Sequence, residues 1–252
     1  MALKTLANAL NLLSFFTREQ PVWGVRDLAK TSGMHHAVVH RTLATFAEAG
    51  FLYQDRESQK YALGIRFYEL GLQVKERLHL ADLVRPAMNR LAQLTGETVF
   101  LTFNDGLEGV CVEIAESPNS LKYTVEVGTR FPMYAGANAK VILAYMGNEQ
   151  REIIRKRGIK QLSKNTKTDW EEIEKQLETI KKDGWSYTEE EFSEGTFGIA
   201  VPLFTGANHI LGSLGIAGPL FRMGNDRVPY FVELLKEQQD VIEKSLFATV
   251  AS

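Results

Sequence analysis

Hydrophobic residues at the start of the chain recur every three or four positions, which is the spacing of one helix face. This stripe predicts a first helix and consists of Leu3, Leu6, Leu10, Leu13 and Phe16. The pattern stops at Gln20-Pro21, where proline removes a backbone hydrogen-bond donor. The chain is therefore expected to begin with one amphipathic helix that ends before the proline.

Two further helices are predicted, separated by a tight turn. The second helix covers residues 24–30 and the third covers residues 35–49. Thr31-Ser32-Gly33 supplies the turn, because glycine enters the left-handed backbone region that a sharp helix exit needs. The positions expected to face inward are Leu28 and Ala29 in the second helix and Val39, Leu43 and Phe46 in the third.

A two-stranded hairpin follows the third helix. Two short apolar runs, residues 51–53 and 60–63, flank a polar tip at residues 54–59. Helix, helix, turn, helix and hairpin is the order of a winged helix-turn-helix, whose third helix enters the major groove of DNA. Units of this kind also serve as protein-interaction modules, so the pattern alone leaves both functions open.

The face of the third helix opposite its apolar stripe carries hydrogen-bond donors, and residues 34–47 contain no Asp or Glu. Such a face suits base edges, and cations on the hairpin suit flanking phosphates. The candidate DNA-binding residues are His35, His36, His40, Arg41 and Thr45 on the helix and Arg56 and Lys60 on the hairpin.

The remainder of the chain predicts a second domain of mixed helices and strands. A helical pattern over residues 65–80 is expected to link the winged helix-turn-helix at residues 1–64 to this domain at residues 81–252. Turns such as Asn104-Asp105-Gly106 favour antiparallel strand pairing, so the fold class is α+β, with an antiparallel sheet flanked by helices.

The elements expected in the second domain follow from local periodicity. Strands are predicted over residues 98–103, 109–115, 121–127, 185–188, 198–204 and 210–217. Helices are predicted over residues 82–95, 137–146 and 225–247, and another begins at a capping box over residues 168–171. Their expected inward positions are Leu83, Ala87, Leu91 and Leu94; Trp170, Ile173, Leu177 and Ile180; and Phe231, Leu235, Ile242 and Leu246.

Composition and charge sharpen this division. The 252 residues are 44% hydrophobic and 24% charged, as in globular proteins of one large or two ordinary domains. The net charge is −2, but residues 1–78 hold ten Lys and Arg against seven Asp and Glu, which suggests a polyanion-binding module on an acidic body. No secretory signal and no membrane-spanning apolar run are visible, so we expect a cytoplasmic protein without a membrane partner.

Motifs along nearly the whole chain resemble those of the IclR family of bacterial transcription regulators. Residues 25–34 resemble the second helix and turn of that family, residues 40–52 its recognition helix and residues 60–64 the return strand of its wing. In the second domain, the segments that resemble the family's effector domain are residues 128–140, 183–195, 200–204 and 215–219. One departure is Ala37-Val38, where the family usually has Ser-Thr. The resemblance implies a GAF-like effector domain, a double-stranded DNA operator, and a homodimer or dimer of dimers.

The resemblance also implies where a small-molecule effector binds. The corresponding positions are Tyr123, Ala137, Asn138, Thr188, Thr196, Gly198, Gly215 and Ala217. Small residues over 135–139 lie at a helix start, whose free N–H groups favour the carboxylate of a small organic acid or a related metabolite. Gly215 and Ala217 stand where relatives that bind short oxoacids have serines, which suggests a larger or less polar effector. Close packing of helix on sheet explains the small residues equally well.

An enzyme is the alternative from another class. Cys111, the single cysteine, could be a nucleophile, but it lies in an apolar strand pattern, and His209 is the one histidine deep in the second domain. The run at residues 189–191 has three glutamates without histidines at metal-ligand spacing, which is typical of a solvated turn. We therefore expect a regulator that is not an enzyme and has no metal or cofactor. A small-molecule-binding enzyme, or a sensor that does not bind DNA, remains the alternative.

Overall fold

The computed structural model describes residues 3–17, 19–78, 80–205, 209–224 and 226–250, without the side chains of 75–78, 80–81 and 246–250. The predicted inward position Leu246 thus lies outside the described side chains. The chain forms two compact units, residues 1–78 and residues 79–252. Each unit has its own core and is considered by itself.

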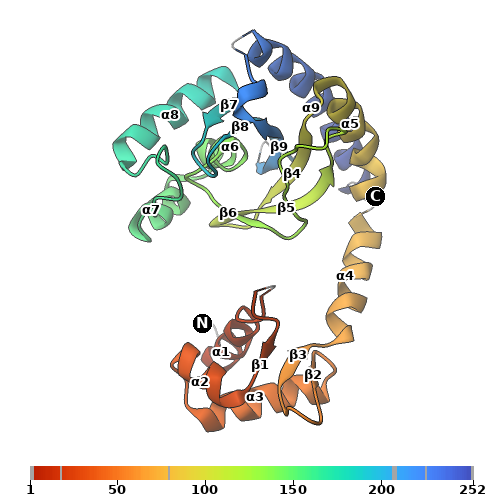
Figure 1. Ribbon diagram of the computed structural model, residues 1–252, viewed down its shortest axis with the longest axis vertical. Coiled ribbons are helices and arrows are strands. Elements are labelled where there is room, and N and C mark those ends of the chain that lie inside the picture. The colour runs from red at the N-terminus through yellow and green to blue at the C-terminus, as the bar shows by residue number, and fades with distance from the viewer. Residues whose placement is uncertain (1–2, 18, 79, 206–208, 225, 251–252) are drawn as a thin grey trace. The chain divides into compact units, whose positions relative to one another are not determined.

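The N-terminal unit contains the predicted helices and hairpin and one strand that the sequence pattern missed. Its elements are α1 (Lys4–Leu13), β1 (Val22–Trp23), α2 (Val25–Ser32), α3 (His36–Glu48), β2 (Leu52–Gln54), β3 (Tyr61–Leu63) and α4 (Ile65–Leu78) (Figure 1). The strands form an antiparallel sheet in the order β1-β3-β2, with Trp23 paired to Tyr61. A strand of two residues is too short to show an alternating pattern, which is why β1 was missed.

The helix-turn-helix geometry agrees with the sequence. Gly33 ends α2 in the left-handed conformation, with φ 69°. The core of this unit consists of Leu12, Phe16, Leu28, Ala29, Val39, Leu43, Leu52 and Tyr61.

The stripe assigned to the first helix is buried only at its C-terminal end, where Phe16 is in the core and Leu13 packs against it. Leu3, Leu6 and Leu10 are 70, 54 and 55% exposed, and the buried residue of α1 is Leu12. A leucine stripe indicates an apolar face, but it does not show whether that face meets the unit's own core or remains uncovered.

The C-terminal unit is a six-stranded antiparallel sheet with helices on both faces. In chain order its elements are α5 (Leu80–Thr95), β4 (Thr98–Asn104), β5 (Glu108–Ala115), β6 (Arg130–Pro132), α6 (Ala137–Tyr145), α7 (Asn148–Lys156), α8 (Trp170–Asp183), β7 (Ser186–Glu189), β8 (Thr196–Phe204), β9 (Ile210–Pro219), the 3-10 turn Leu220–Arg222 and α9 (Arg227–Val250). The strand order is β6-β5-β4-β9-β8-β7. The mixed helix-and-sheet class and the antiparallel sheet are confirmed.

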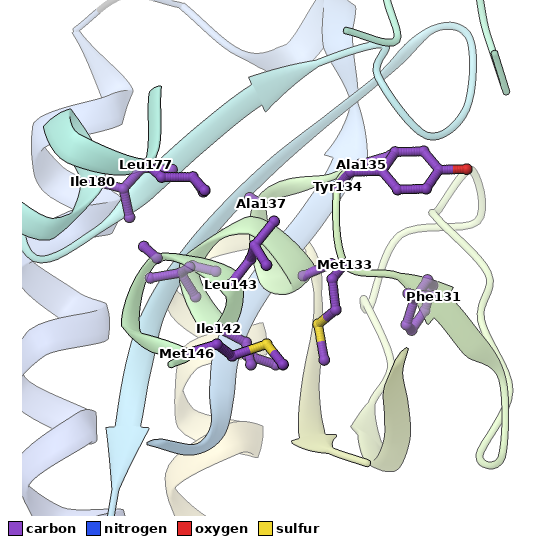
Figure 2. Packing of buried hydrophobic residues seen from close by; sticks show 14 of the residues in the cluster. Phe131, Met133, Tyr134, Ala135, Ala137, Ile142, Leu143, Met146, Leu177 and Ile180 are labelled. Atoms are coloured by element: carbon purple, nitrogen blue, oxygen red, sulfur yellow. The ribbon is translucent and has the colours of Figure 1, made fainter. Parts of the chain in front are cut away.

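Alternation along the central strands assigns side chains to two cores. Val99 and Leu101 of β4 pack in one core with residues of α5 and α9, which lie side by side in Figure 1. Phe100, between them, packs in the other core with residues of α6 and α8. Figure 2 shows part of this second core, where Leu177 and Ile180 of α8 lie beside Leu143 of α6.

One predicted strand is absent and another lies in a predicted loop. Residues 121–127 form no strand, and the edge strand β6 lies within residues 128–134. Leu121 and Val127 are exposed, whereas Tyr123 and Val125 pack against the second core. The alternation of this segment therefore reflects one-sided burial of an irregular segment rather than pairing in the sheet.

Three details of the helices also differ from expectation. α7 was not predicted. The N-cap of α8 is Asp169, whose side chain accepts a hydrogen bond from the Glu171 backbone N–H, rather than Thr168 of the proposed capping box. In α5, Leu94 is exposed, and Met88 is fully buried instead.

β8 pairs with β7 over only part of its length, so the rest of that side of the strand has no partner strand. Residues up to Ala200 pair with β7, and Pro202 follows beyond that partner. Further along the strand, the backbone N–H of Phe204 donates to a side chain, Glu243 Oε1 of α9, at 2.8 Å.

Candidate functional site

The predicted reading face of α3 is exposed, and its opposite face is core. Val39 and Leu43 are fully buried, whereas His36, His40 and Arg41 are exposed, and His35 is exposed at the N-cap. Within the described part of the chain, Arg41 has no ion-pair or hydrogen-bond partner for its guanidinium group. A free guanidinium on an exposed helix face can bind a base edge or a phosphate.

Thr45 differs from the other predicted reading residues. Its hydroxyl is exposed but donates to the Arg41 backbone carbonyl at 2.9 Å, one turn back along α3. A hydroxyl has a single proton to donate, so Thr45 can offer DNA only an acceptor while this bond is formed.

Arg56 and Lys60 both lie at the exposed tip between β2 and β3. The tip is ordered by Asp55, whose Oδ1 accepts from the backbone N–H of Ser58 at 2.8 Å and from its hydroxyl at 2.6 Å. These bonds to the carboxylate hold the pKa of Asp55 below its usual value. The two cations therefore project from a turn that has its own hydrogen bonds.

A pocket with about 420 Å³ of empty space, part of it open to solvent, lies at the N-terminus of α6 in the C-terminal unit. Seven of the eight expected effector residues line it: Tyr123, Ala137, Asn138, Thr188, Thr196, Gly198 and Ala217. They come from α6, from β7, β8 and β9, and from the irregular segment before β6. Figure 2 shows Ala137 at the start of α6, near the chain that carries Tyr134 and Ala135.

Gly215 is the eighth expected residue, and it does not line the pocket. A Cβ placed on Gly215 would lie 1.9 Å from Asn138 Oδ1, so the Asn138 side chain covers this glycine. The space expected at Gly215 is thus already filled by the protein. The glycine is needed for packing the Asn138 amide, whose Nδ2 donates to Thr102 Oγ1 at 3.4 Å.

Sequence reasoning missed most of the apolar wall. Four phenylalanines line the pocket: Phe100, Phe131, Phe192 and Phe197. Phe131 lies between the rings of Phe100 and Phe192, with centroid distances of 6.0 and 5.2 Å. A single aromatic residue within the acidic run 189–194 was the signal that could have identified Phe192.

The acidic run is not a solvated turn throughout, which corrects the expectation for residues 189–191. Glu191 lines the pocket, and its side chain is 7% exposed. Its Oε1 lies 2.5 Å from Nζ of Lys140, whose side chain is 1% exposed, and its Oε2 accepts from the Gly136 backbone N–H at 3.3 Å. Lys140 also donates to Gln176 Oε1 of α8 at 2.6 Å. Burial lowers the pKa of Lys140, and the charge of Glu191 opposes this shift.

Residues 190–195, between β7 and β8, form a strap that supplies one side of the pocket. Thr166 Oγ1 donates to the Glu191 carbonyl at 2.7 Å, and the Ser163 hydroxyl donates to the Glu190 carbonyl. The Gly195 N–H donates to Glu190 Oε1 at 2.8 Å. The strap is thus tied to the segment before α8 as well as to α6.

The candidate nucleophile is buried and protonated. Cys111 is fully buried, and burial raises the pKa of its thiol to about 12. His209, which was expected deep in the second domain, is exposed. Over the described ranges, no group of His, Cys, Asp and Glu side chains could hold a metal ion, and none of the described helices has the length and apolarity of a membrane span.

Comparison with known proteins covers both units. Residues 5–56 match the family described as IclR helix-turn-helix domain, and residues 72–244 match Bacterial transcriptional regulator IclR C-terminal. This chain belongs to the IclR family. A relative, the HTH-type transcriptional regulator KipR of Bacillus subtilis (strain 168), is 31% identical over 93% of both chains.

Solved structures of the IclR family share the fold. An IclR transcriptional regulator from Silicibacter sp. TM1040 superimposes with a TM-score of 0.90 at 25% identity, over 96% of each chain. An IclR homologue from Microbacterium hydrocarbonoxydans, in complex with 4-hydroxybenzoate, superimposes with a TM-score of 0.80 at 24% identity, over 99% of this chain and 100% of that one. The protein is therefore an IclR-family transcriptional regulator with a helix-turn-helix domain and an effector-binding domain.

Proposed function

We propose that α3 reads the operator in the major groove through His35, His36, His40, Arg41 and Thr45, while Arg56 and Lys60 contact flanking phosphates. The observation that carries this proposal is the exposure of His36, His40 and Arg41 opposite the buried Val39 and Leu43. Residues 1–64 are assigned to DNA binding, 65–80 to a linker helix and 81–252 to effector binding. Acting on DNA, the protein would function in the cytoplasm.

DNA binding is tested with duplexes selected from a random pool, at several salt concentrations. Phosphate contacts by lysine and arginine release counterions, so the logarithm of affinity should fall linearly with the logarithm of salt concentration. A double variant, Arg56→Gln with Lys60→Gln, should reduce the magnitude of this slope by about two, because it removes two phosphate contacts. If the protein is a sensor that works only through protein contacts, the selection should not enrich any duplex from the pool.

We propose that the effector binds in the pocket at α6, with its apolar body against the phenylalanines and its polar groups near Thr188, Thr196 and the N-terminus of α6. The aromatic lining supports an aromatic or largely apolar effector. The 4-hydroxybenzoate bound by the Microbacterium homologue is an organic acid of this kind, and it is a suitable first probe beside a metabolite panel.

The pocket is tested by filling it. A Cβ on Gly198 would lie 3.3 Å from Ala137 Cβ and 3.5 Å from Thr188 Oγ1, so Gly198→Val places bulk between pocket residues. This variant should lose the ligand-induced rise in melting temperature and the effect of the ligand on operator affinity. The matched control is Gly147→Val, because a Cβ there meets only Gln150 Oε1, at 3.9 Å. A full effector response in Gly198→Val would place the effector elsewhere.

We also propose that the protein is a dimer or dimer of dimers and is not an enzyme. One recognition helix reads few base pairs, and two copies on a pseudo-palindrome supply further specificity. Leu6 and Leu10 on α1 and Leu70 and Val74 on α4 are exposed apolar residues that a second copy could cover. Light scattering at micromolar concentration should give at least twice the monomer mass, and a monomer would contradict the proposal.

A further inference from the structure

The effector pocket has an unusual charge distribution for a site that faces a helix N-terminus. Its lining contains the carboxylates of Glu190 and Glu191, and none of the described residues that line it is Lys, Arg or His. Carboxylates of the protein repel an anionic ligand, and they do so strongly where water is excluded. Whether the pocket accepts an anion therefore depends on how these two charges are neutralised.

Glu191 is neutralised by a residue outside the pocket lining. The carboxylate lies between Lys140 Nζ, at 2.5 Å, and the Gly136 N–H, at 3.3 Å. Gly136 is the N-cap of α6, and Lys140 lies in the next turn of the same helix. The side chains of Lys140 and Glu191 are both more than nine-tenths buried, so bulk water and salt screen this pair poorly.

Glu190 is neutralised differently. Its Oε2 lies 3.8 Å from Nζ of Lys164, whose side chain is 65% exposed, and accepts from Asn165 Nδ2 at 3.2 Å. An exposed lysine at that distance contributes little, because water screens the pair whether or not the lysine is present. Glu191 is therefore paired with a buried lysine, whereas the neighbouring Glu190 is paired with an exposed lysine.

We propose that Lys140 determines the ligand charge that the pocket accepts, by neutralising Glu191 from outside the lining. With Lys140 present, the charge of Glu191 is balanced, so the N–H groups at the start of α6 can attract an anionic group at Ala137. Without Lys140, the charge of Glu191 opposes that attraction. Lys140 touches no ligand in this arrangement and is a positioning residue. The inference rests on the proposal that the effector binds in this pocket, but its test needs no effector.

The test measures the electrostatic potential at the start of α6 with a thiol. In an Ala137→Cys background, the new side chain is at the first residue of α6, and its pKa reports the local charge. The pKa is read from the ultraviolet absorbance of the thiolate as pH is raised. Cys111 does not interfere, because burial holds the pKa of its thiol at about 12.

Three variants in this background give opposite expected shifts. Lys140→Met leaves Glu191 unneutralised and should raise the thiol pKa by about one unit. Glu191→Gln removes the negative charge and should lower the thiol pKa, by less than one unit because burial lowers the pKa of the unpaired Lys140. The double variant restores neutrality and should return the pKa to that of the background. Damage to packing would move both single variants in the same direction. The matched control, Lys164→Met, should have a much smaller effect.

Each result decides the proposal. A folded Lys140→Met variant with an unchanged thiol pKa, or single variants that shift in the same direction, would overturn it and leave the effector proposal intact. If Lys140→Met does not fold, the lowered pKa in Glu191→Gln and the return in the double variant are still required. Loss of effector response in Gly198→Val concerns the pocket itself and is a separate outcome.

Discussion

On α3, the residues that form the core and the residues that are available for binding occupy opposite faces. Val39 and Leu43 are buried in the core, and Arg41 is exposed on the other face. On α6 the same residues do both: every residue from Ala137 to Ala144 is buried, and Ala137 and Asn138 also line the pocket. Substitutions on the exposed face of α3 should therefore change binding without changing stability, whereas substitutions around α6 should change both.

The largest expected effect is at the buried ion pair beside α6. Glu191→Leu leaves Lys140 buried without a counter-charge and should destabilise the C-terminal unit by about 3–5 kcal/mol. Urea unfolding followed by the fluorescence of Trp170 and Trp185, in a Trp23→Phe background, measures this unit alone. The double variant with Lys140→Met should recover most of the loss. A loss below about 1 kcal/mol in Glu191→Leu would show that the pair is not stabilised by mutual neutralisation.

The next effect is at Gly215, where a side chain must displace Asn138. Gly215→Leu should destabilise the C-terminal unit by about 1–3 kcal/mol, because a Cβ alone would overlap Asn138 Oδ1 at 1.9 Å. Adding Asn138→Ala removes the overlapping amide and should reduce the loss in a double-mutant cycle measured by thermal unfolding. Additive losses would mean that Asn138 is not the group that Gly215 accommodates.

The smallest effect on stability, with a clear effect on function, is expected on α3. Arg41→Ala should weaken binding to a selected operator by about 1–3 kcal/mol and change stability by less than about 0.5 kcal/mol. Fluorescence anisotropy at fixed salt gives the affinity. Leu43→Ala, two residues away on the buried face, should instead lose about 2–5 kcal/mol of stability. Unchanged DNA affinity in folded Arg41→Ala would remove this residue from the interface.

The same contrast explains which features were predictable from sequence. The helices and the hairpin of the N-terminal unit follow from local signals, because helical periodicity and the Gly33 turn act over a few residues, whereas the two-residue strand β1 does not. The uncovered leucines of α1 show the limit: local pattern identifies an apolar face and does not tell what it contacts. Motif resemblance pointed to seven residues that line the pocket.

What could not be predicted depends on pairs of residues far apart in the chain. From its neighbours in the sequence, Glu191 was predicted to belong to a solvated turn, but it is buried and bonded to Lys140, fifty-one residues earlier. Gly215 was predicted to adjoin the effector, but the side chain of Asn138, on α6, fills that space. The strand at residues 121–127 failed for the same reason, because alternation records burial and does not reveal a pairing partner.

Pro202 on the outer side of β8 has a consequence for solubility during folding. Beyond the end of β7 this side of the strand has no partner in the sheet, and unpaired strand edges that are exposed before folding is complete recruit other chains into aggregates. Proline has no N–H to offer an incoming strand, and the nearby N–H of Phe204 is already bonded to Glu243. The part of β8 that extends beyond β7 therefore gives a foreign strand little to pair with, even though its side chains are strongly apolar.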